Sequence, residues 1–231
     1  MKNQRFFFDA VFFLIAAGEI ASHSIHSEIL HFIFKPLLLI WLLIYFIVYT
    51  KENFNSFAKL ISAGFLFSWL GDVFLMFDHN AEQYFLFGLF SFLCTHVCYI
   101  LAFLNSVKSK EGFLQKKWFY ALPFVLAGTV NIITLYPKLG TFAIPTGIYG
   151  FAIITMVLCA LNRKSAVSEK SFRLIFSGAI SFMISDSILS ANKFLMEIPL
   201  AEIFIMTTYI AAQYLIMRGS IVYLKEKNIT S

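Results

Sequence analysis

The stretch that decides the fold is Gly64–Met76, which reads GFLFSWLGDVFLM and is apolar nearly throughout, yet contains the aspartate Asp72. It has an echo in Gly178–Ser190, which reads GAISFMISDSILS and contains Asp186 at the corresponding place. Positions 72 and 186 lie 114 residues apart, and twice this offset nearly spans the 231 residues of the chain. The echo predicts a duplicated chain whose halves, about 1–114 and 115–231, each contribute one buried carboxylate.

The composition places the whole chain in a membrane. Hydrophobic residues make up 59% of it and charged residues only 13%, and its mean hydropathy is +0.78. A soluble domain of this size needs far more polar surface. Apolar runs recur along the whole length, and the first run lacks the cleavage site of a signal peptide. We therefore expect one multi-pass domain over residues 1–231, in the cell membrane (inner or plasma membrane).

Eight apolar segments are long enough to cross a bilayer as helices, which takes about 20 residues each. Helices are expected because lipid offers no partner for backbone polar groups, and the runs are too long for barrel strands. The predicted spans are Phe6–Ser22, Phe32–Tyr49, Ser56–Phe77, Tyr84–Asn105, Trp118–Tyr136, Thr141–Leu161, Phe172–Ser190 and Leu200–Tyr223. The predicted fold class is therefore all-α, an integral membrane bundle of eight transmembrane helices.

The basic residues predict the orientation of this bundle. All but three of the 18 lysines and arginines flank the termini or the even-numbered loops, and only Lys35, Lys138 and Lys193 lie on the other side. By the positive-inside rule, both termini are cytoplasmic. The offset of 114 residues maps the first four spans onto the last four, so the two four-helix repeats run parallel. This topology accounts for the net charge of +5, and we expect no nucleic-acid partner.

Both aspartates are expected at similar depth, in the outward-facing half of the membrane. Asp72 comes shortly before the end of its span, about 8 Å below that end at a rise of about 1.5 Å per residue. Gly64 and Ser68 share one helical face with Asp72. Ser177, Ser181 and Ser185 likewise share a face of the seventh span. Small residues at this spacing let helices approach closely. We therefore expect both carboxylates in the bundle interior, where the third and seventh spans would meet.

Other polar side chains fall near the same level of the membrane. They are Glu19, Lys35, Tyr149, Asn192 and Lys193, with Gln213 inside the eighth span. His96 and Tyr99 share a face of the fourth span. His96 lies about 18 Å below the outer end of that span, at about 1.5 Å per residue, deeper than the aspartates. We therefore rank His96 below the other side chains as a direct partner of the carboxylates.

Each of these residues also has a purely structural interpretation. The aspartates could pair with Lys35 and Lys193, or these lysines could extend their ammonium groups to the membrane interface. His96 and Gln213 could be satisfied by hydrogen bonds between helices. Glu19, which has no counterpart in the second half, could be structural as well. An intramembrane aspartate is nevertheless costly and usually functional.

Metal chemistry is not expected from the sequence. His23, His26 and His31 have a spacing that metal sites can use, but no carboxylate can be placed on the same turn. The three cysteines lie inside apolar runs, where packing is their expected role. We therefore predict no metal and no cofactor.

A pair of buried carboxyl groups carries chemistry of its own. Burial and mutual repulsion keep one of them protonated while the other stays charged, which supplies a proton donor and a base in one pocket. Such a pair suits acid-catalysed hydrolysis through an oxocarbenium-like state. It equally suits a proton relay in a transporter. The sequence contains no Gly-x-Ser-x-Gly elbow and no phosphate-binding loop.

Short signatures follow one another along the chain in a definite order. They are Lys35-Pro36-Leu37, Gly71-Asp72 with Leu75-Met76, His96 with Tyr99, Pro145 with Tyr149, Ser185-Asp186 with Leu189, Asn192-Lys193-Phe194, and Ala212-Gln213. Each signature is weak alone. Their order, their spacing and the eight-span layout together resemble the YhhN family of membrane proteins, whose animal members are lysoplasmalogenases. The resemblance runs over nearly the whole chain.

The resemblance implies hydrolysis of the vinyl ether bond of a lysophospholipid, lysoplasmenyl-ethanolamine or lysoplasmenyl-choline. The products are a fatty aldehyde and glycerophospho-ethanolamine or glycerophospho-choline, and no cofactor is implied. One carboxyl of the pair Asp72 and Asp186 would protonate the β-carbon by general acid catalysis. The other would stabilise the cation and activate water. The lipid chain would lie among the phenylalanines, and its phosphate near Lys35 or Lys193.

Further residues are expected to line the pocket or to position the carboxylates. They are Tyr99, Tyr149, Asn192 and Gln213, with His96 and Glu19 as additional members. A different function stays open, namely a membrane transporter or lipid-binding protein that uses the two aspartates as a proton or cation site. A metal-dependent amidase or lipid hydrolase would need clustered histidines on helices, and we expect only His96 on one.

Overall fold

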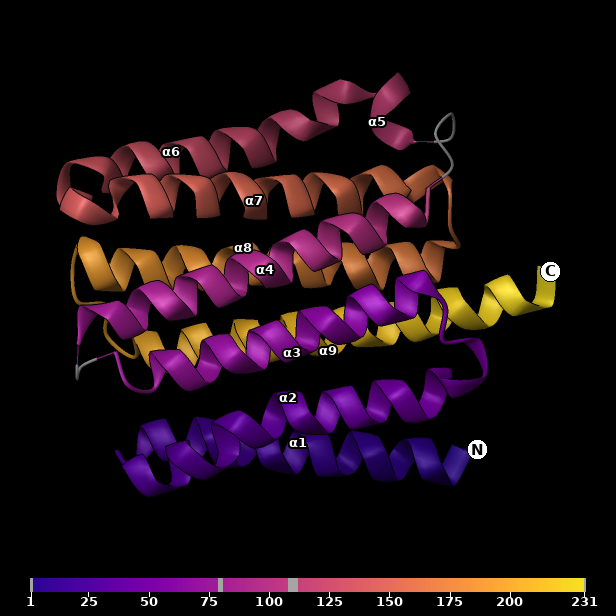
Figure 1. The fold of residues 1–231 in the computed structure, drawn as a ribbon, viewed down its shortest axis with the longest axis horizontal. Helices are drawn as coiled ribbons and strands as arrows, with labels where there is room; N and C mark the ends of the chain where they lie inside the picture. The colour runs from indigo at the N-terminus through magenta and orange to yellow at the C-terminus, as the bar shows by residue number, and fades with distance from the viewer. Residues whose placement is uncertain (1, 79–80, 108–111, 231) are drawn as a thin grey trace.

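The computed structural model describes residues 2–78, 81–107 and 112–230. Within these ranges the chain forms eight helices of 18 residues or more and no strand (Figure 1). They are α1 (Lys2–Ser24), α2 (Glu28–Thr50), α3 (Ser56–Leu75), α4 (Glu82–Asn105), α6 (Leu122–Leu139), α7 (Ala143–Asn162), α8 (Glu169–Phe194) and α9 (Ala201–Thr230), with the short α5 (Phe113–Lys116) before α6. The prediction of an all-α bundle with eight long helices is confirmed. Lys108 and Lys110, predicted to flank the fourth loop, lie outside the described residues.

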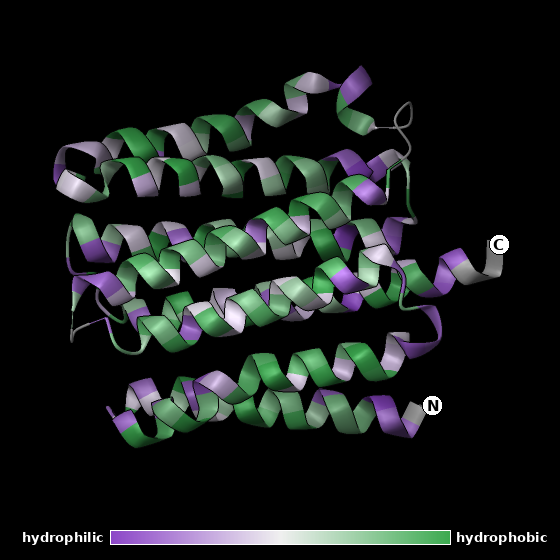
Figure 2. Ribbon diagram, in the orientation of Figure 1, coloured by the Kyte–Doolittle hydropathy of each residue, from purple (hydrophilic) through white to green (hydrophobic). Residues whose placement is uncertain are grey.

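Hydrophobic residues make up most of each long helix, and hydrophilic residues gather toward the helix ends (Figure 2). Six segments of the described chain are long and apolar enough to cross a membrane. One of them, Trp118–Ser165, includes both α6 and α7, because a turn of 3-10 helix joins the two helices. Helix α9 is not among the six, since Gln213 and Arg218 interrupt its apolar sequence. The described chain thus has six candidate spans where eight were predicted, because α6 and α7 count as one segment and α9 is not counted.

Successive long helices run in alternating directions, so that both termini lie at the same end of the bundle (Figure 1). The most extensive packing joins α3 to α4 and α8 to α9. Helices α1 and α2 flank this centre on one side, and α6 and α7 on the other (Figure 1). The prediction that the two aspartate-bearing helices, α3 and α8, would meet directly is wrong. Each packs mainly against its sequence neighbour, and the aspartates face a common space instead.

Glycines permit the close approach within each central pair of helices. A Cβ atom added to Gly64 would overlap the ring of Tyr99 on α4. In α8 the equivalent position, Gly178, would place a Cβ 2.9 Å from the backbone oxygen of Ala212 on α9. Ser177, predicted on the packed face of this helix, is exposed on the bundle surface. The packed face of α8 therefore runs through Ile175, Gly178 and Phe182, and not through Ser177.

Candidate functional site

A polar cavity of about 730 Å³ contains both aspartates in its wall. The wall is built from the α1–α2 turn, the C-terminal end of α3 and the α8–α9 connection. Figure 1 places these segments at the end of the bundle opposite the two termini. Asp72 and Asp186, which were predicted as a pair from their sequence echo, therefore face the same space from helices that pack against different neighbours.

Asp72 is held in the cavity wall by a tyrosine from the last helix. The residue is only 3% exposed, and its Oδ2 accepts a hydrogen bond of 2.8 Å from the hydroxyl of Tyr209 on α9. The charges of Lys35, Glu19 and Asp186 are all near enough to act on the Asp72 carboxyl. Lys35 is a largely buried residue and lines the same cavity. Its ammonium group is therefore the cationic neighbour of the Asp72 carboxyl.

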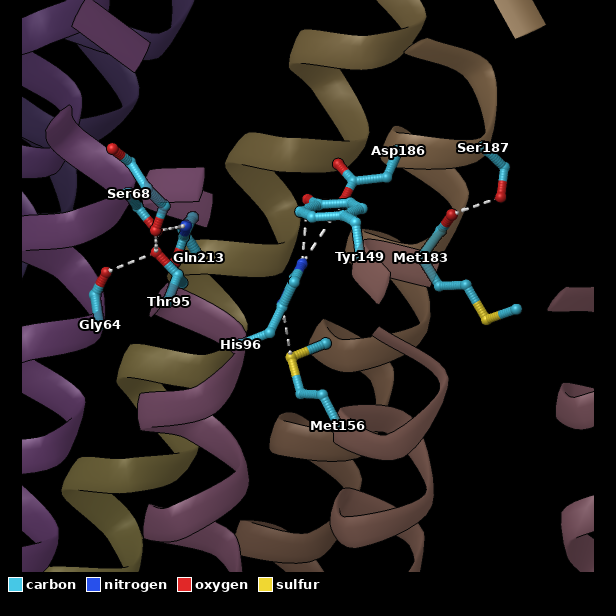
Figure 3. Close-up of polar contacts among 11 residues, drawn as sticks. Gly64, Ser68, Thr95, His96, Tyr149, Met156, Met183, Asp186, Ser187 and Gln213 are labelled. Atoms are coloured by element: carbon cyan, nitrogen blue, oxygen red, sulfur yellow. Dashed lines mark hydrogen bonds and ion pairs between the residues drawn. The ribbon is translucent and has the colours of Figure 1, made fainter. Parts of the chain in front are cut away.

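Asp186 has two polar neighbours, one from α7 and one from α4 (Figure 3). Its Oδ2 accepts a hydrogen bond from the hydroxyl of Tyr149, and it lies 3.5 Å from Nε2 of His96. The same His96 nitrogen lies 3.0 Å from the Tyr149 hydroxyl. The three side chains converge in Figure 3, so that a phenol, an imidazole and a carboxyl can exchange a proton among themselves.

The low rank given to His96 as a direct partner of the carboxylates is therefore wrong. Helix α8 continues to Phe194, beyond the predicted end at Ser190, which places Asp186 deeper in the bundle than expected. His96 is fully buried, and its other ring nitrogen, Nδ1, lies 3.4 Å from the sulfur of Met156. The imidazole therefore turns one nitrogen toward the carboxyl cluster and the other toward an apolar wall.

Asp186 also borders an apolar pocket of about 60 Å³ between α4, α6, α7 and α8. The apolar residues of this pocket include Leu89, Ile132, Leu135, Ile153 and Met183. Leu75, Phe92 and Leu189 belong to both the pocket and the polar cavity, as Asp186 does. This carboxyl thus lies at the junction of a polar and an apolar compartment, an arrangement that suits an amphipathic ligand.

Two predicted pocket residues are located away from the cavity. Tyr99 is fully buried and donates a hydrogen bond of 2.7 Å to Oε1 of Gln213. Nε2 of Gln213 donates in turn to Ser68 on α3, 2.9 Å away, and Figure 3 shows this group apart from the Asp186 cluster. The geometry favours the structural interpretation of Gln213 as a link between helices. Neither side chain lines the cavity.

The remaining predicted residues have mixed positions. Asn192 lines the cavity, and its side-chain oxygen accepts a hydrogen bond of 2.9 Å from the backbone of Ile198. Lys193 forms an ion pair of 2.7 Å with Asp78 and does not line the cavity. The alternative in which Lys193 pairs with one of the two central aspartates therefore has no support. Glu19 lies behind the cavity wall, where it contacts two histidines.

Several important residues were missed from the sequence. Tyr209, the partner of Asp72, lies one helical turn before Gln213, and this shared face was the available signal. Arg163 was assigned to a loop, yet it is fully buried and donates a hydrogen bond of 2.7 Å to Ser106. His23 lies on α1 and His31 on α2, so the expectation that only His96 is helical is also wrong.

Comparisons with known proteins agree on a family. The YhhN family matches residues 30–220 of the chain, a range that includes both aspartates. Lysoplasmalogenase TMEM86A from Bos taurus is 31% identical over 170 residues, and the protein of the same name from Homo sapiens is 31% identical over 169 residues. Each match covers 71% of this chain and 66% of the relative, slightly less than two thirds of the relative's length. No solved structure matches the chain significantly.

Proposed function

The chain belongs to the YhhN family and is a multi-pass membrane protein, and from this premise we propose that it is a hydrolase of the lysoplasmalogenase type. Its substrate would be a lysophospholipid with a vinyl ether bond, such as lysoplasmenyl-ethanolamine or lysoplasmenyl-choline. Two relatives named lysoplasmalogenase support this reaction class. The observation that carries the proposal is the position of Asp186 at the junction of the polar cavity and the apolar pocket, with Asp72 in the same cavity.

The two compartments fit the two ends of such a lipid. The glycerophosphate headgroup would occupy the polar cavity, near the ammonium of Lys35, and the first part of the chain would enter the apolar pocket. In a vinyl ether the β-carbon is on the chain side and the ether oxygen on the headgroup side. The β-carbon would therefore lie next to Asp186, and the carbon bearing oxygen would face Asp72.

This orientation assigns a role to each carboxyl. Protonated Asp186 donates its proton to the β-carbon, which produces an oxocarbenium ion at the neighbouring carbon. Ionised Asp72 stabilises this cation and accepts a proton from the water that adds to it, and the product is a hemiacetal. Asp72 then returns that proton to the leaving ether oxygen, while the hemiacetal hydroxyl gives its proton to Asp186. The fatty aldehyde and the glycerophospho-alcohol are released, and both carboxyls regain their starting states.

Tyr149 and His96 would position Asp186 for this step. The Tyr149 hydroxyl fixes one oxygen of the carboxyl, and His96 contacts both groups. A donor aimed at the carboxylate stabilises the charge that forms when Asp186 loses its proton. Asp72 accepts a similar hydrogen bond from Tyr209, so the assignment of Asp186 as the acid rests on its place at the junction of the two compartments.

We also propose that the bundle consists of two parallel repeats with cytoplasmic termini. The two most extensive helix pairs, α3 with α4 and α8 with α9, are the pairs that the offset of 114 residues relates. The placement of the termini at one end, with the loops that carry most basic residues, supports the orientation. The polar cavity would then open on the side away from the cytoplasm.

The proposal is tested by incubating the purified protein with lysoplasmenyl-ethanolamine and analysing the products by mass spectrometry. We expect a fatty aldehyde and glycerophosphoethanolamine from the native protein, and at least about 100-fold less of either in the same time from Asp72→Asn or Asp186→Asn. If the folded native protein forms no product, the hydrolase proposal fails for this lipid. Proton-coupled flux in liposomes would then favour the alternative of a transporter that uses the same two carboxylates.

A further inference from the structure

Three side chains of the kind that bind metals meet at one wall of the polar cavity, and the proposed hydrolysis uses none of them. Glu19 and His23 lie one turn apart near the end of α1, and His31 lies early in α2. Oε1 of Glu19 is 3.1 Å from Nε2 of His23 and 2.8 Å from Nδ1 of His31. One potential ligand atom from each residue lies within 4.8 Å of the other two. The expectation that no carboxylate lies on the same turn as these histidines is therefore wrong, because Glu19 is one turn before His23 on α1 and the α1–α2 turn brings His31 to both.

Glu19 has an oxygen atom that nothing satisfies. The residue is fully buried, which is rare for a glutamate. Its Oε1 contacts the two imidazoles, but its Oε2 is buried with no hydrogen-bond partner among the described residues. A buried carboxylate oxygen without a partner is costly, so its retention beside two imidazoles indicates a ligand that the cluster binds.

The donor set fits zinc better than the harder divalent cations. Imidazole nitrogen and carboxylate oxygen bind Zn²⁺ at about 2.0–2.2 Å, and in a tetrahedral site the ligand atoms then lie about 3.3 Å apart. The observed separations of 2.8 Å and 3.1 Å are close to that value. Calcium and magnesium prefer sets of oxygen ligands, which this cluster does not supply.

We propose that Glu19, His23 and His31 bind one Zn²⁺ ion, with one coordination position left open toward the cavity. Both histidines line the cavity, whereas Glu19 lies behind them. Because the ligands come from two helices, the ion clamps α1 to α2 at the cavity rim. Lys35 lies one turn after His31 on α2, so the ion adds positive charge to the wall that already carries this ammonium group.

Without metal, the cluster has a competing explanation. Two protonated histidines could donate hydrogen bonds to Glu19 and neutralise it. That arrangement satisfies Oε1 but leaves Oε2 without a partner. The two explanations differ in whether the native protein binds zinc with a defined stoichiometry, which can be measured without any assay of hydrolysis. The outcome is therefore independent of the proposed function.

The experiment uses the full chain in detergent, with the affinity tag removed and bound metal stripped by a chelator. Zn²⁺ is then titrated in competition with a chromophoric chelator, and bound zinc is counted by elemental mass spectrometry. We expect one zinc per chain for the native protein. Glu19→Gln and His31→Gln should each weaken zinc binding by more than about 100-fold, because loss of a ligand exceeds the effect of losing a supporting hydrogen bond.

His26→Asn provides the matched control. His26 lies in the α1–α2 turn and lines the same cavity, but it does not contact Glu19 in the structure. Its φ of 53° is a left-handed conformation that asparagine tolerates. This variant should keep the native zinc affinity, which would show that the effect is specific to the cluster and not to any histidine in the turn.

Two results would overturn the site. The first is the absence of stoichiometric zinc in the native protein, and the second is unchanged binding in both ligand variants. If the ligand variants fail to elute as folded protein, X-ray absorption of the zinc-loaded native protein decides instead. Two imidazole ligands and one carboxylate would support the site, and any other ligand set would contradict it.

Discussion

Asp72 and Asp186 occupy corresponding positions in the two halves of the sequence, yet their surroundings differ. Asp72 accepts a hydrogen bond from one tyrosine and lies near Lys35, whereas Asp186 contacts Tyr149 and His96. Lys35 and Tyr149 are also 114 positions apart, so they occupy corresponding positions in the two halves. In the first half this position carries the ammonium group near Asp72, and in the second half it carries the phenol that contacts Asp186. In the proposed mechanism, these different neighbours and compartments would make one of two similar carboxyls the acid and the other the base.

The largest effect is expected at the carboxyl that borders the apolar pocket. Asp186→Asn removes the proposed proton donor, so kcat should fall by about 10²–10⁴-fold, the usual contribution of a general acid. Turnover of lysoplasmenyl-ethanolamine by the purified variant checks this. Asp78→Asn, which changes a carboxyl at the same cavity, is the control and should stay within a few-fold of native activity. If Asp186→Asn kept native turnover, Asp186 would not be the proton donor and the proposed roles of the two carboxyls would be wrong.

The second effect distinguishes Asp72 from Asp186. Asp72→Asn should lower kcat by about 10²-fold, because the asparagine neither stabilises the cation nor accepts a proton from water. In the native protein we expect a normal solvent deuterium isotope effect, since proton transfer to carbon limits the rate. This isotope effect should shrink in Asp72→Asn, where addition of water becomes slower. An undiminished isotope effect would show that the two carboxyls do not have separate roles.

A third comparison uses two tyrosines that each donate a hydrogen bond between helices. Tyr149→Phe removes the hydrogen bond to Asp186 and should lower kcat by about tenfold with little change in KM, as expected for about 1.4 kcal/mol. Tyr99→Phe removes the hydrogen bond to Gln213, far from the cavity, and should lower the free energy of unfolding by about 1–3 kcal/mol while turnover persists. Thermal unfolding and kinetics are measured on both. The reverse pattern would mean that Tyr99, and not Tyr149, serves the site.

The smallest effect concerns the headgroup. Lys35→Met should raise KM for the lysolipid by roughly tenfold, about 1.4 kcal/mol of binding, and leave kcat nearly unchanged. Lys193→Met is the matched control, because Lys193 pairs with Asp78 and does not line the cavity. Equal KM changes in both variants would indicate a general effect of surface charge and would remove Lys35 from the headgroup site.

The sequence predicted the helices because a bilayer imposes length and apolarity on each of them. All eight long helices begin near the predicted spans, and only α9, which continues to Thr230, runs well beyond its predicted end. The aspartates of Gly64–Met76 and Gly178–Ser190 do face one cavity. Contacts between helices were less predictable. The prediction that α3 and α8 pack directly against each other was wrong, since hydropathy does not determine which helices become neighbours.

Contacts that depend on helix tilt, turns and helix extension could not be predicted from the sequence either. His96 approaches Asp186 because α8 extends to Phe194, and Glu19 approaches His31 because the α1–α2 turn folds the chain back on itself. Arg163 lies in the connection between α7 and α8, as its charge predicted, but it is buried there and serine hydroxyls accept hydrogen bonds from it. Such positions are fixed by tertiary packing, which the one-dimensional pattern does not encode.

The most direct test of the division of roles between Asp186 and Asp72 is hydrolysis in D₂O, with mass analysis of the aldehyde. Protonation at the β-carbon predicts an aldehyde with one deuterium on the carbon next to the carbonyl, formed by the native protein and not by Asp186→Asn. Authentic aldehyde incubated with that variant measures background exchange. An aldehyde without deuterium above this background, or equal labelled product from Asp186→Asn, would contradict the mechanism.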